Sequence, residues 1–203
     1  MFTDIILSLL SLLKQKLYCD IESVVYIKND EHIPDIHPKI NVEYKLISNI
    51  NDLEIYLGNK KIKKNFYKFR YFILHGCKMY LLLKDDDIAG HIFICKLSDF
   101  KPYLYNNHSV FNGDDTYYAF CAHTFDEYRG NRLHPYMNSI VLKDTIKKNE
   151  KVFATASNKN LIAEKGIERA GWLALGVLKY KSIGHITFVN TFKKFSIDVT
   201  KDE

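Results

Sequence analysis

The sequence predicts a single mixed α/β domain in which helices cover both faces of a central sheet. Three observations predict this class. Segments with β and helical periodicity alternate along the chain, the chain ends in two consecutive β segments, and 47% of its 203 residues are hydrophobic. That fraction of apolar residues is enough to form one full core. A chain of this length leaves no residues for a second domain. The sheet should be mixed, because strand–helix–strand units give parallel pairs and hairpins give antiparallel ones.

The first 39 residues are predicted to form an N-terminal extension of one amphipathic helix and one strand. Apolar residues recur at helical spacing from Phe2 to Leu13, a stretch too short to cross a bilayer, which needs about 20 apolar residues. We expect this helix to lie on the domain or on a second copy of the chain, as in a homodimer; contact with a membrane surface is the alternative. A strand at Glu22–Lys28 follows, and two prolines then separate residues 1–39 from a main domain at 40–203.

The main domain is predicted to begin with a strand, helical segments and a β-hairpin. Residues suited to helix capping follow the first strand, and three consecutive aspartates suit the turn of the hairpin. The expected elements are a strand at 41–47, a helix after 48–52, a helical stretch through 66–73, and hairpin strands at 78–84 and 88–97. The long loop at 98–115 comes next, and loops of that length often carry function.

The second half of the domain continues the alternation of strands and helices. A tight polar turn at Asp126–Gly130 joins the first strand of this half to its first helix. The expected elements are strands at 116–125 and 151–156, helices at 131–148 and 160–170, and final strands at 172–181 and 183–192. Helices between strands should cover the faces of the sheet.

Composition and cysteine spacing narrow the function classes. The formal charge of +5 arises from 29 basic and 24 acidic residues spread along the chain, and the lysines between Lys60 and Lys64 are interpreted as the solvated face of a helix, so no nucleic-acid partner is predicted. The four cysteines form neither a CxxC pair nor a zinc-binding spacing, so no metal site is predicted. Their mostly apolar surroundings indicate reduced thiols, and the apolar start lacks the features of a signal peptide, which together favour a cytoplasmic location.

The strongest local signal is the turn Glu127–Leu133 between a predicted strand and a predicted helix. A helix start presents unpaired N–H groups and the positive end of the helix dipole, so a strand that enters a helix through Gly130 can hold a diphosphate. Arg129 and Arg132 add positive charge at the same place. Taken alone, such a pattern is more often a glycine turn with two solvated arginines.

A second pattern gives the turn a context. The segment Asn160-Leu161-Ile162-Ala163 opens a predicted helix, which ends at Gly171-Trp172 where the next strand starts. Together with the RG turn, this order resembles the GNAT superfamily of N-acetyltransferases, whose usual motifs are (Q/R)-x-x-G-x-(G/A) and N-x-x-S with a terminal GF. The resemblance runs from the hairpin near Asp86 to the end of the chain. It implies a sheet that is splayed between its central strands, with acetyl-CoA as the acyl donor.

The resemblance also implies which residues meet the cofactor. The pantetheine arm would pair with the strand before the turn, the diphosphate would lie on the start of the helix, and the asparagine that opens the later helix would lie near the thiol. The implied cofactor-binding residues are Ala122, His123, Thr124, Arg129, Gly130, Asn131, Arg132, Leu133, His134 and Asn160.

Five positions depart from the usual family pattern. Glu127 replaces the leading Gln or Arg, and Arg132 stands where the second Gly or Ala belongs. Ala163 replaces Ser and Trp172 replaces Phe, which are milder changes. Ile167 occupies the position where many family members carry a tyrosine that protonates the leaving thiolate. With Ile167 at that position, the usual tyrosine that acts as the general acid is missing.

Two residues are candidates for the catalytic base. His123 lies on the strand that would bind the cofactor, and an imidazole titrates near neutral pH; the alternative is a hydrogen-bonded core histidine. Asp115, next to Asp114 at the start of the same strand, could relay a proton through water; the alternative is an Asx-type turn. His134 is interpreted as a contact to the cofactor rather than a base.

The sequence therefore predicts an N-acetyltransferase that moves an acetyl group from acetyl-CoA to a primary amine of a small molecule. Direct attack is expected, because no cysteine or serine lies in a nucleophile motif. Two alternatives keep the fold: an inactive module that binds CoA or a protein partner, and a transferase of longer acyl groups. The aromatic and polar residues of the 98–115 loop suit an amino sugar, an amino acid and a polyamine equally.

Overall fold

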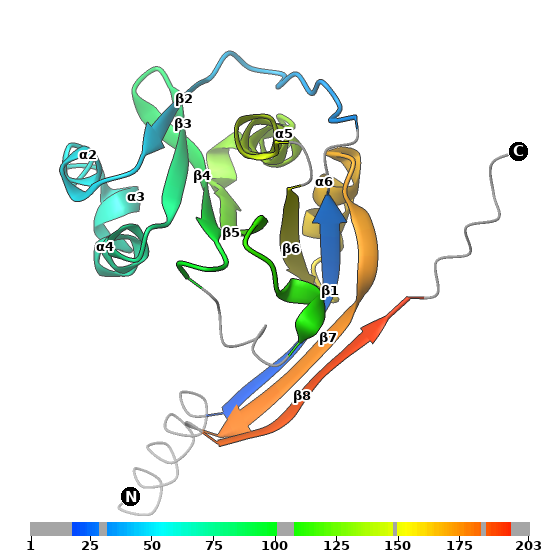
Figure 1. Ribbon diagram of the computed structural model, residues 1–203. Coiled ribbons are helices and arrows are strands. Elements are labelled where there is room, and N and C mark those ends of the chain that lie inside the picture. Colours follow the sequence, from blue (N-terminus) through cyan, green and yellow to red (C-terminus); the bar gives the residue numbers. More distant parts are fainter. Residues whose placement is uncertain (1–17, 29–31, 101–107, 148–149, 184–185, 196–203) are drawn as a thin grey trace, which may run out of the picture.

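The strands of the chain form one eight-stranded mixed sheet, as predicted (Figure 1). The computed structural model describes residues 18–28, 32–100, 108–147, 150–183 and 186–195. Along the sheet the strands follow the order β2-β3-β4-β5-β6-β1-β7-β8. They are β1 (Tyr18–Lys28), β2 (Glu43–Ile47), β3 (Lys78–Lys84), β4 (Asp87–Lys96), β5 (Thr116–Thr124), β6 (Lys151–Ser157), β7 (Leu173–Ile183) and β8 (Ile186–Lys194).

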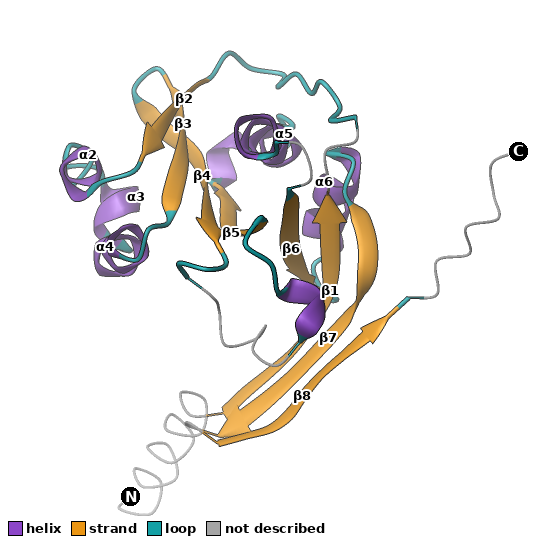
Figure 2. Cartoon of the chain, viewed as in Figure 1, coloured by secondary structure: helices purple, strands orange, loops and turns teal. Residues whose placement is uncertain are grey.

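Helices cover both faces of the sheet and build two separate cores (Figure 2). The helices are α2 (Ile50–Glu54), α3 (Lys60–Lys63), α4 (Phe66–Leu74), α5 (Leu133–Thr145) and α6 (Leu161–Arg169). On one face, Phe69 and Ile73 of α4 pack on the sheet with the apolar residues of α2 and α3. On the other, Met137 of α5 and Ile167 of α6 pack against the opposite side. None of the described helices has the length and apolar character needed to cross a membrane.

The sheet opens between β5 and β6, which form its parallel pair. Their pairing starts at Thr116 and ends where Ala119 faces Ala154. Beyond this point β5 continues to pair with β4 alone, and β6 continues with β1 alone. The two strands therefore part at their C-terminal ends, which confirms the predicted splay. Because α5 and its flanking turns connect the two strands, the start of α5 lies at the mouth of this opening.

A β-bulge lies on β5 where the sheet opens. Across the β4–β5 ladder, Phe120 faces Phe93 and His123 faces His91, so Cys121 and Ala122 together oppose a single residue of β4. Cys121 has φ of 53°, the left-handed conformation that a bulge of this kind requires. A bulge leaves its extra residue outside the ladder, so backbone polar groups are available here to a ligand.

The N-terminal strand β1 is an interior strand of the sheet. This strand is predicted to belong to an N-terminal extension, but β1 lies between β6 and β7 and is antiparallel to both. Val25 and Tyr26 on it are buried. β1 is thus integral to the main sheet, and the boundary at residue 39 stays a prediction. The apolar helix predicted from Phe2 to Leu13 lies outside the described residues.

The segment that joins β1 to β2, residues 32–42, crosses over α5 and is called the strap here (Figure 1). Its backbone carbonyl at Pro34 accepts a hydrogen bond from Ser139 Oγ at 2.8 Å, and Asp35 forms an ion pair with Lys143 at 2.6 Å. At its other end, the N–H of Lys39 donates to the carbonyl of Asn131 at 3.0 Å. The strap is therefore fastened to α5 and to the turn before α5.

Candidate active site

A cavity of about 1050 Å³ lies where β5 ends and α5 begins. Four segments form its wall: the C-terminal end of β5, the turn and first residues of α5, one stripe of α6, and the strap. The lining residues are Asp35, Ile36, His37, Lys39, Ala122, His123, Thr124, Tyr128, Arg129, Gly130, Arg132, Leu133, His134, Pro135, Asn160, Ile162, Ala163, Gly166 and Arg169. The structure thus gathers nine of the ten predicted cofactor residues around one space, all except Asn131.

The turn before α5 lines this cavity and carries backbone N–H groups that are not used within the described residues. Gly130 and Arg132 have φ of 81° and 60°, and these left-handed residues turn the chain from β5 into the helix. Tyr136 makes the first hydrogen bond of the helix, to the carbonyl of Arg132 at 3.2 Å. Among the described residues, the N–H groups of residues 130–134 have no hydrogen-bond acceptor. Unpaired donors at the positive end of a 13-residue helix form a place where an anion can bind.

Lys61 holds the turn in place. Its ammonium donates to Asp87 at 2.8 Å, to the carbonyl of Ile88 at 2.7 Å, and forms an ion pair with Glu127 at 2.7 Å. The hydroxyl of Tyr128 donates to the same Asp87 carboxylate at 2.8 Å. Hydrogen bonds from Lys61 and then Tyr128 lower the pKa of Asp87 from 3.8 to about 2. This network gives Glu127, which departs from the family motif, a partner on α3.

The lysine cluster of α3 is not a uniformly solvated face. The side chain of Lys61 is only 18% exposed and lies over the rings of Phe125 and Tyr128, 4.7 and 5.0 Å from their centroids. The interpretation of residues 60–64 as a solvated helix face is therefore wrong for Lys61. Neighbouring residues of a helix point in different directions, so these lysines cannot all lie on one face.

Two buried polar atoms on the cavity wall have no partner among the described residues: Oγ1 of Thr124 and Nδ1 of His134. Burying a polar group without a hydrogen bond is unfavourable, so such atoms mark places where a ligand or a water completes the bonding. Burial lowers the pKa of His134, which favours its neutral form. The free amides and these two atoms fit a ligand with both an anionic and an amide-bearing part.

His123 lines the cavity on the part of β5 that pairs with β4 but no longer with β6. Its ring is 4.8 Å from that of Phe125 and 5.7 Å from that of His91, measured between centroids. Burial, together with the charge of Arg129, lowers the pKa of His123. The imidazole is therefore neutral at neutral pH and can accept a proton, as a base must.

Asp115, the other predicted base, lies outside the cavity. It is exposed at the start of β5, where its carbonyl accepts a hydrogen bond from the N–H of Lys151 at 3.0 Å. At about 3.3 Å per residue, four residues place it roughly 13 Å before the point at Ala119 where the sheet opens. The paired part of β5 and β6 lies between them, so the geometry argues against a role for Asp115 as the base.

Two predicted asparagines have structural roles. Asn160 caps α6, with its side-chain oxygen accepting the N–H of Ala163 at 3.1 Å, and it lines the cavity at the same time. Asn131 donates from its side chain to the carbonyl of Tyr128 at 3.1 Å and so stabilises the turn from outside the cavity wall. Ile167, which stands at the family's tyrosine position, is buried in the core below α6.

Sequence reasoning missed the strap and most of the α6 stripe. Asn160, Ala163, Gly166 and Arg169 follow one another at intervals of three, which places them on one face of α6. That spacing, counted from the predicted Asn160, could have identified them. The strap residues carry no comparable local signal, because only the position of β1 in the sheet brings them over the cavity.

Comparison with known proteins supports the architecture. No protein-family model matches the sequence, and neither does any curated protein. Among solved structures, a GNAT-family acetyltransferase from Colwellia psychrerythraea is similar with a TM-score of 0.54 at 10% identity, over 82% of this chain and 57% of its own. A GCN5-related N-acetyltransferase from Kribbella flavida gives 0.50 at 10% identity, over 87% of this chain and 64% of its own.

A third structure comes from a larger protein. It is the GCN5-related glucosamine N-acetyltransferase region of a fungal multi-domain β-N-acetylglucosaminidase, with a TM-score of 0.54 at 11% identity, over 86% of this chain and 22% of its own. The chain spans less than two thirds of the length of each of these three structures. At such identities the similarity establishes the fold, and the chain has the fold of the GCN5-related N-acetyltransferases.

Proposed function

We propose that the protein is an N-acetyltransferase that moves an acetyl group from acetyl-CoA to a primary amine of a small molecule by direct attack. The observation that carries this proposal is the row of unpaired N–H groups at residues 130–134, a segment that, apart from Asn131, lines the cavity at the opening of the sheet. A diphosphate fits the charge and the hydrogen-bonding capacity of that row.

The free edge of β5 supports the same ligand. Beyond Ala119, β5 has lost its pairing with β6, so the backbone from Phe120 to Thr124 can pair with an extended chain that carries amide groups. The pantetheine arm of CoA is such a chain. The unpartnered Oγ1 of Thr124 gives it a further hydrogen-bonding group at the same edge.

When bound, acetyl-CoA supplies a thioester whose carbonyl carbon is open to attack by an amine. His123 takes one proton from the substrate ammonium, and the freed amine forms the C–N bond. Backbone N–H groups at the Cys121 bulge would stabilise negative charge on the carbonyl oxygen of a donor bound along β5. Loss of the second amine proton to the departing sulfur would complete the transfer, which would give an amide, a free thiol and protonated His123.

The proposal is tested by incubating the full chain with acetyl-CoA and a panel of amino sugars, amino acids and polyamines. Release of free thiol that depends on the amine is the expected result. The variant His123→Gln should lower kcat by about 10²- to 10⁴-fold, the usual contribution of a general base. In the wild type, the rate should fall as the pH drops through the lowered pKa of His123, and this acidic limb should disappear in the variant.

One observation favours a second candidate, an inactive module that binds CoA or a partner. Ile167 puts a buried aliphatic side chain where a proton donor would be expected from the resemblance. A series of donors from acetyl to long-chain acyl-CoA separates the readings: a module turns over none of them, and a long-chain transferase turns over only the longer ones. Calorimetric titration that detects no binding of CoA would reject the transferase and the CoA-binding module together.

A further inference from the structure

The cavity wall carries more positive charge than a diphosphate on the start of α5 would use. We propose that the strap and the last turn of α6 form a second anion subsite, in which Lys39 and Arg169 bind the 3′-phosphate on the ribose of CoA. This inference rests on the function proposed above. It concerns residues that neither the family motifs nor the sequence analysis singled out.

Lys39 is held beside the turn that precedes α5. Its backbone N–H donates to the carbonyl of Asn131 at 3.0 Å, which fixes its backbone next to the row of unpaired amides. Lys39 is one of the residues that line the cavity, and it is exposed. Among the described residues, no carboxylate lies within ion-pair distance of its ammonium. The charge of Lys39 is therefore available to an anion in the cavity.

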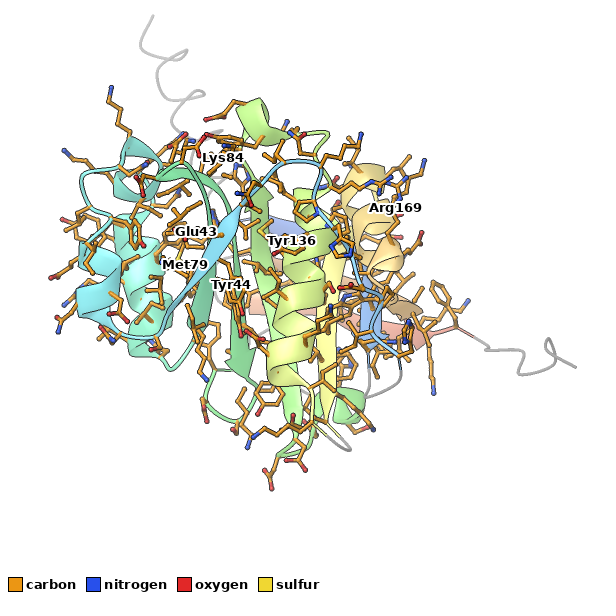
Figure 3. All side chains as sticks on the ribbon, turned by 90° about the horizontal axis from the view of Figure 1, so that it is seen from above. Glu43, Tyr44, Met79, Lys84, Tyr136 and Arg169 are labelled. Carbon is orange, nitrogen blue, oxygen red and sulfur yellow. The ribbon has the colours of Figure 1, made fainter. Side chains whose placement is uncertain are left out.

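Arg169 approaches the same place from α6. One turn before it, Gly166 is so close to His134 that an added Cβ would lie 2.2 Å from Nδ1 of that ring. Arg169 is three residues further along, about 4.5 Å along the helix axis. Its side chain lines the cavity, and no carboxylate within ion-pair distance is recorded for it in the part of the chain that the structure describes. Seen from above, the strap crosses α5 toward the side of the molecule where Arg169 lies (Figure 3).

The acidic residue on the cavity wall does not cancel these charges. Asp35 is the one carboxylate among the residues that line the cavity, and it is engaged by Lys143 at 2.6 Å and by His37 at 3.1 Å. Arg129 is likewise engaged, by Asp126 at 2.7 Å. Among the described residues, Lys39 on the strap and Arg169 on α6 thus line the cavity without an ion pair, as does Arg132 of the turn itself.

The geometry matches the chemistry of the 3′-phosphate. A phosphomonoester carries nearly two negative charges and three strong acceptor oxygens, which suit a lysine and an arginine that approach from two sides. In CoA this group is one ribose ring away from the diphosphate. With the diphosphate on the start of α5, the 3′-phosphate is therefore within reach of the cations that flank that start. A donor without this phosphate would leave both cations unpaired.

The test compares binding of CoA and of 3′-dephospho-CoA to the full chain by calorimetry. The wild type should bind CoA at least about tenfold more tightly, because hydrogen bonds to charged groups contribute this much or more. The double variant Lys39→Gln/Arg169→Gln should lose that preference, and each single variant should lose part of it. Lys165→Gln is the matched control, since Lys165 is exposed on α6 and does not line the cavity. Thermal unfolding confirms that each variant is folded.

The outcomes separate this inference from the function on which it rests. Equal affinity of the wild type for the two ligands would overturn the inference and leave the proposed transferase standing. A preference for CoA that survives in the double variant would overturn the assignment to Lys39 and Arg169. If neither ligand binds the wild type, both the proposed function and this inference are wrong.

Discussion

At the scale of single residues, Arg132 shows how the chain departs from a family motif at a defined conformational cost. Its φ of 60° is the left-handed conformation that glycine adopts freely and other residues adopt at a cost of about 1–2 kcal/mol. Arg132 is exposed at the cavity, so it adds a positive charge where the motif has a small residue. The backbone strain and the positive charge thus belong to the same residue.

Replacing Arg132 by glycine should therefore raise the free energy of unfolding by about 1 kcal/mol, because the left-handed strain is relieved. Urea denaturation at neutral pH measures this change. Arg132→Ala is the matched control: it removes the same charge and keeps a Cβ at the strained position, so it should give no such gain. Equal stabilisation by alanine and glycine would show that charge repulsion, not backbone strain, is the cause.

Asp87 gives a prediction about pH at the same scale. Its folded-state pKa, lowered to about 2 by Lys61 and Tyr128, lies below its usual value of 3.8. The carboxylate therefore contributes stability that is fully present above about pH 4 and is lost as the pH falls through 2. Thermal unfolding between pH 2 and 5 should show a shallower loss for Asp87→Asn than for the wild type. Asp86→Asn, an exposed neighbour outside the network, should follow the wild type; a wild-type slope in Asp87→Asn would contradict the account.

At the scale of elements, the contact between α5 and α6 sets the width of the cavity. Gly166 lets the two helices approach until the His134 ring lies against the α6 backbone. The same contact buries Nδ1 of His134 and brings the α6 stripe to the cavity wall. A larger residue at position 166 would have to push the helices apart or displace the ring.

Gly166→Ala should accordingly destabilise the protein by about 1–3 kcal/mol, the usual cost of overpacking. Gly58→Ala serves as the control, because no atom lies within 4 Å of the Cβ that would be added there. The cost should shrink in the double variant Gly166→Ala/His134→Ala, where the ring is gone. If Gly166→Ala destabilises the protein equally when the His134 ring is absent, a clash with that ring is not the cause.

At the scale of the whole molecule, the sheet depends on a strand that the sequence predicts to belong to an N-terminal extension. β1 pairs with β6 on one side and with β7 on the other, so it joins the half of the sheet that carries the opening to the β7–β8 hairpin (Figure 1). A chain lacking residues 1–28 would leave β6 and β7 as unpaired edges and should not unfold cooperatively in calorimetry. Asp20→Ala, which removes an exposed ion pair with Lys181 and keeps β1 in the sheet, should unfold as one unit. Cooperative unfolding of the shortened chain would contradict this view.

How much the sequence could predict depends on whether the signal was local. The RG turn, the cap at Asn160 and the hairpin at Asp85–Asp87 are set by residues close together in the chain, and the structure confirms each as a local element. The insertion of β1 between β6 and β7 depends on pairing across more than a hundred residues, which no local pattern encodes. The path of the strap follows from that insertion, so the strap residues that line the cavity could not be predicted from local sequence. Asp115 lies outside the cavity because its position before the paired part of β5, which its residue type does not reveal, decides where it lies.

The central claim is that the N–H groups at the start of α5 are open to a ligand at the mouth of the splayed sheet. Titration of the isotope-labelled chain with CoA, followed by amide NMR, tests it most directly. The account predicts large shifts for the amides of residues 130–134, together with those of Ala122 to Thr124 on β5. Binding of CoA that leaves these resonances unchanged and shifts another part of the molecule would contradict it.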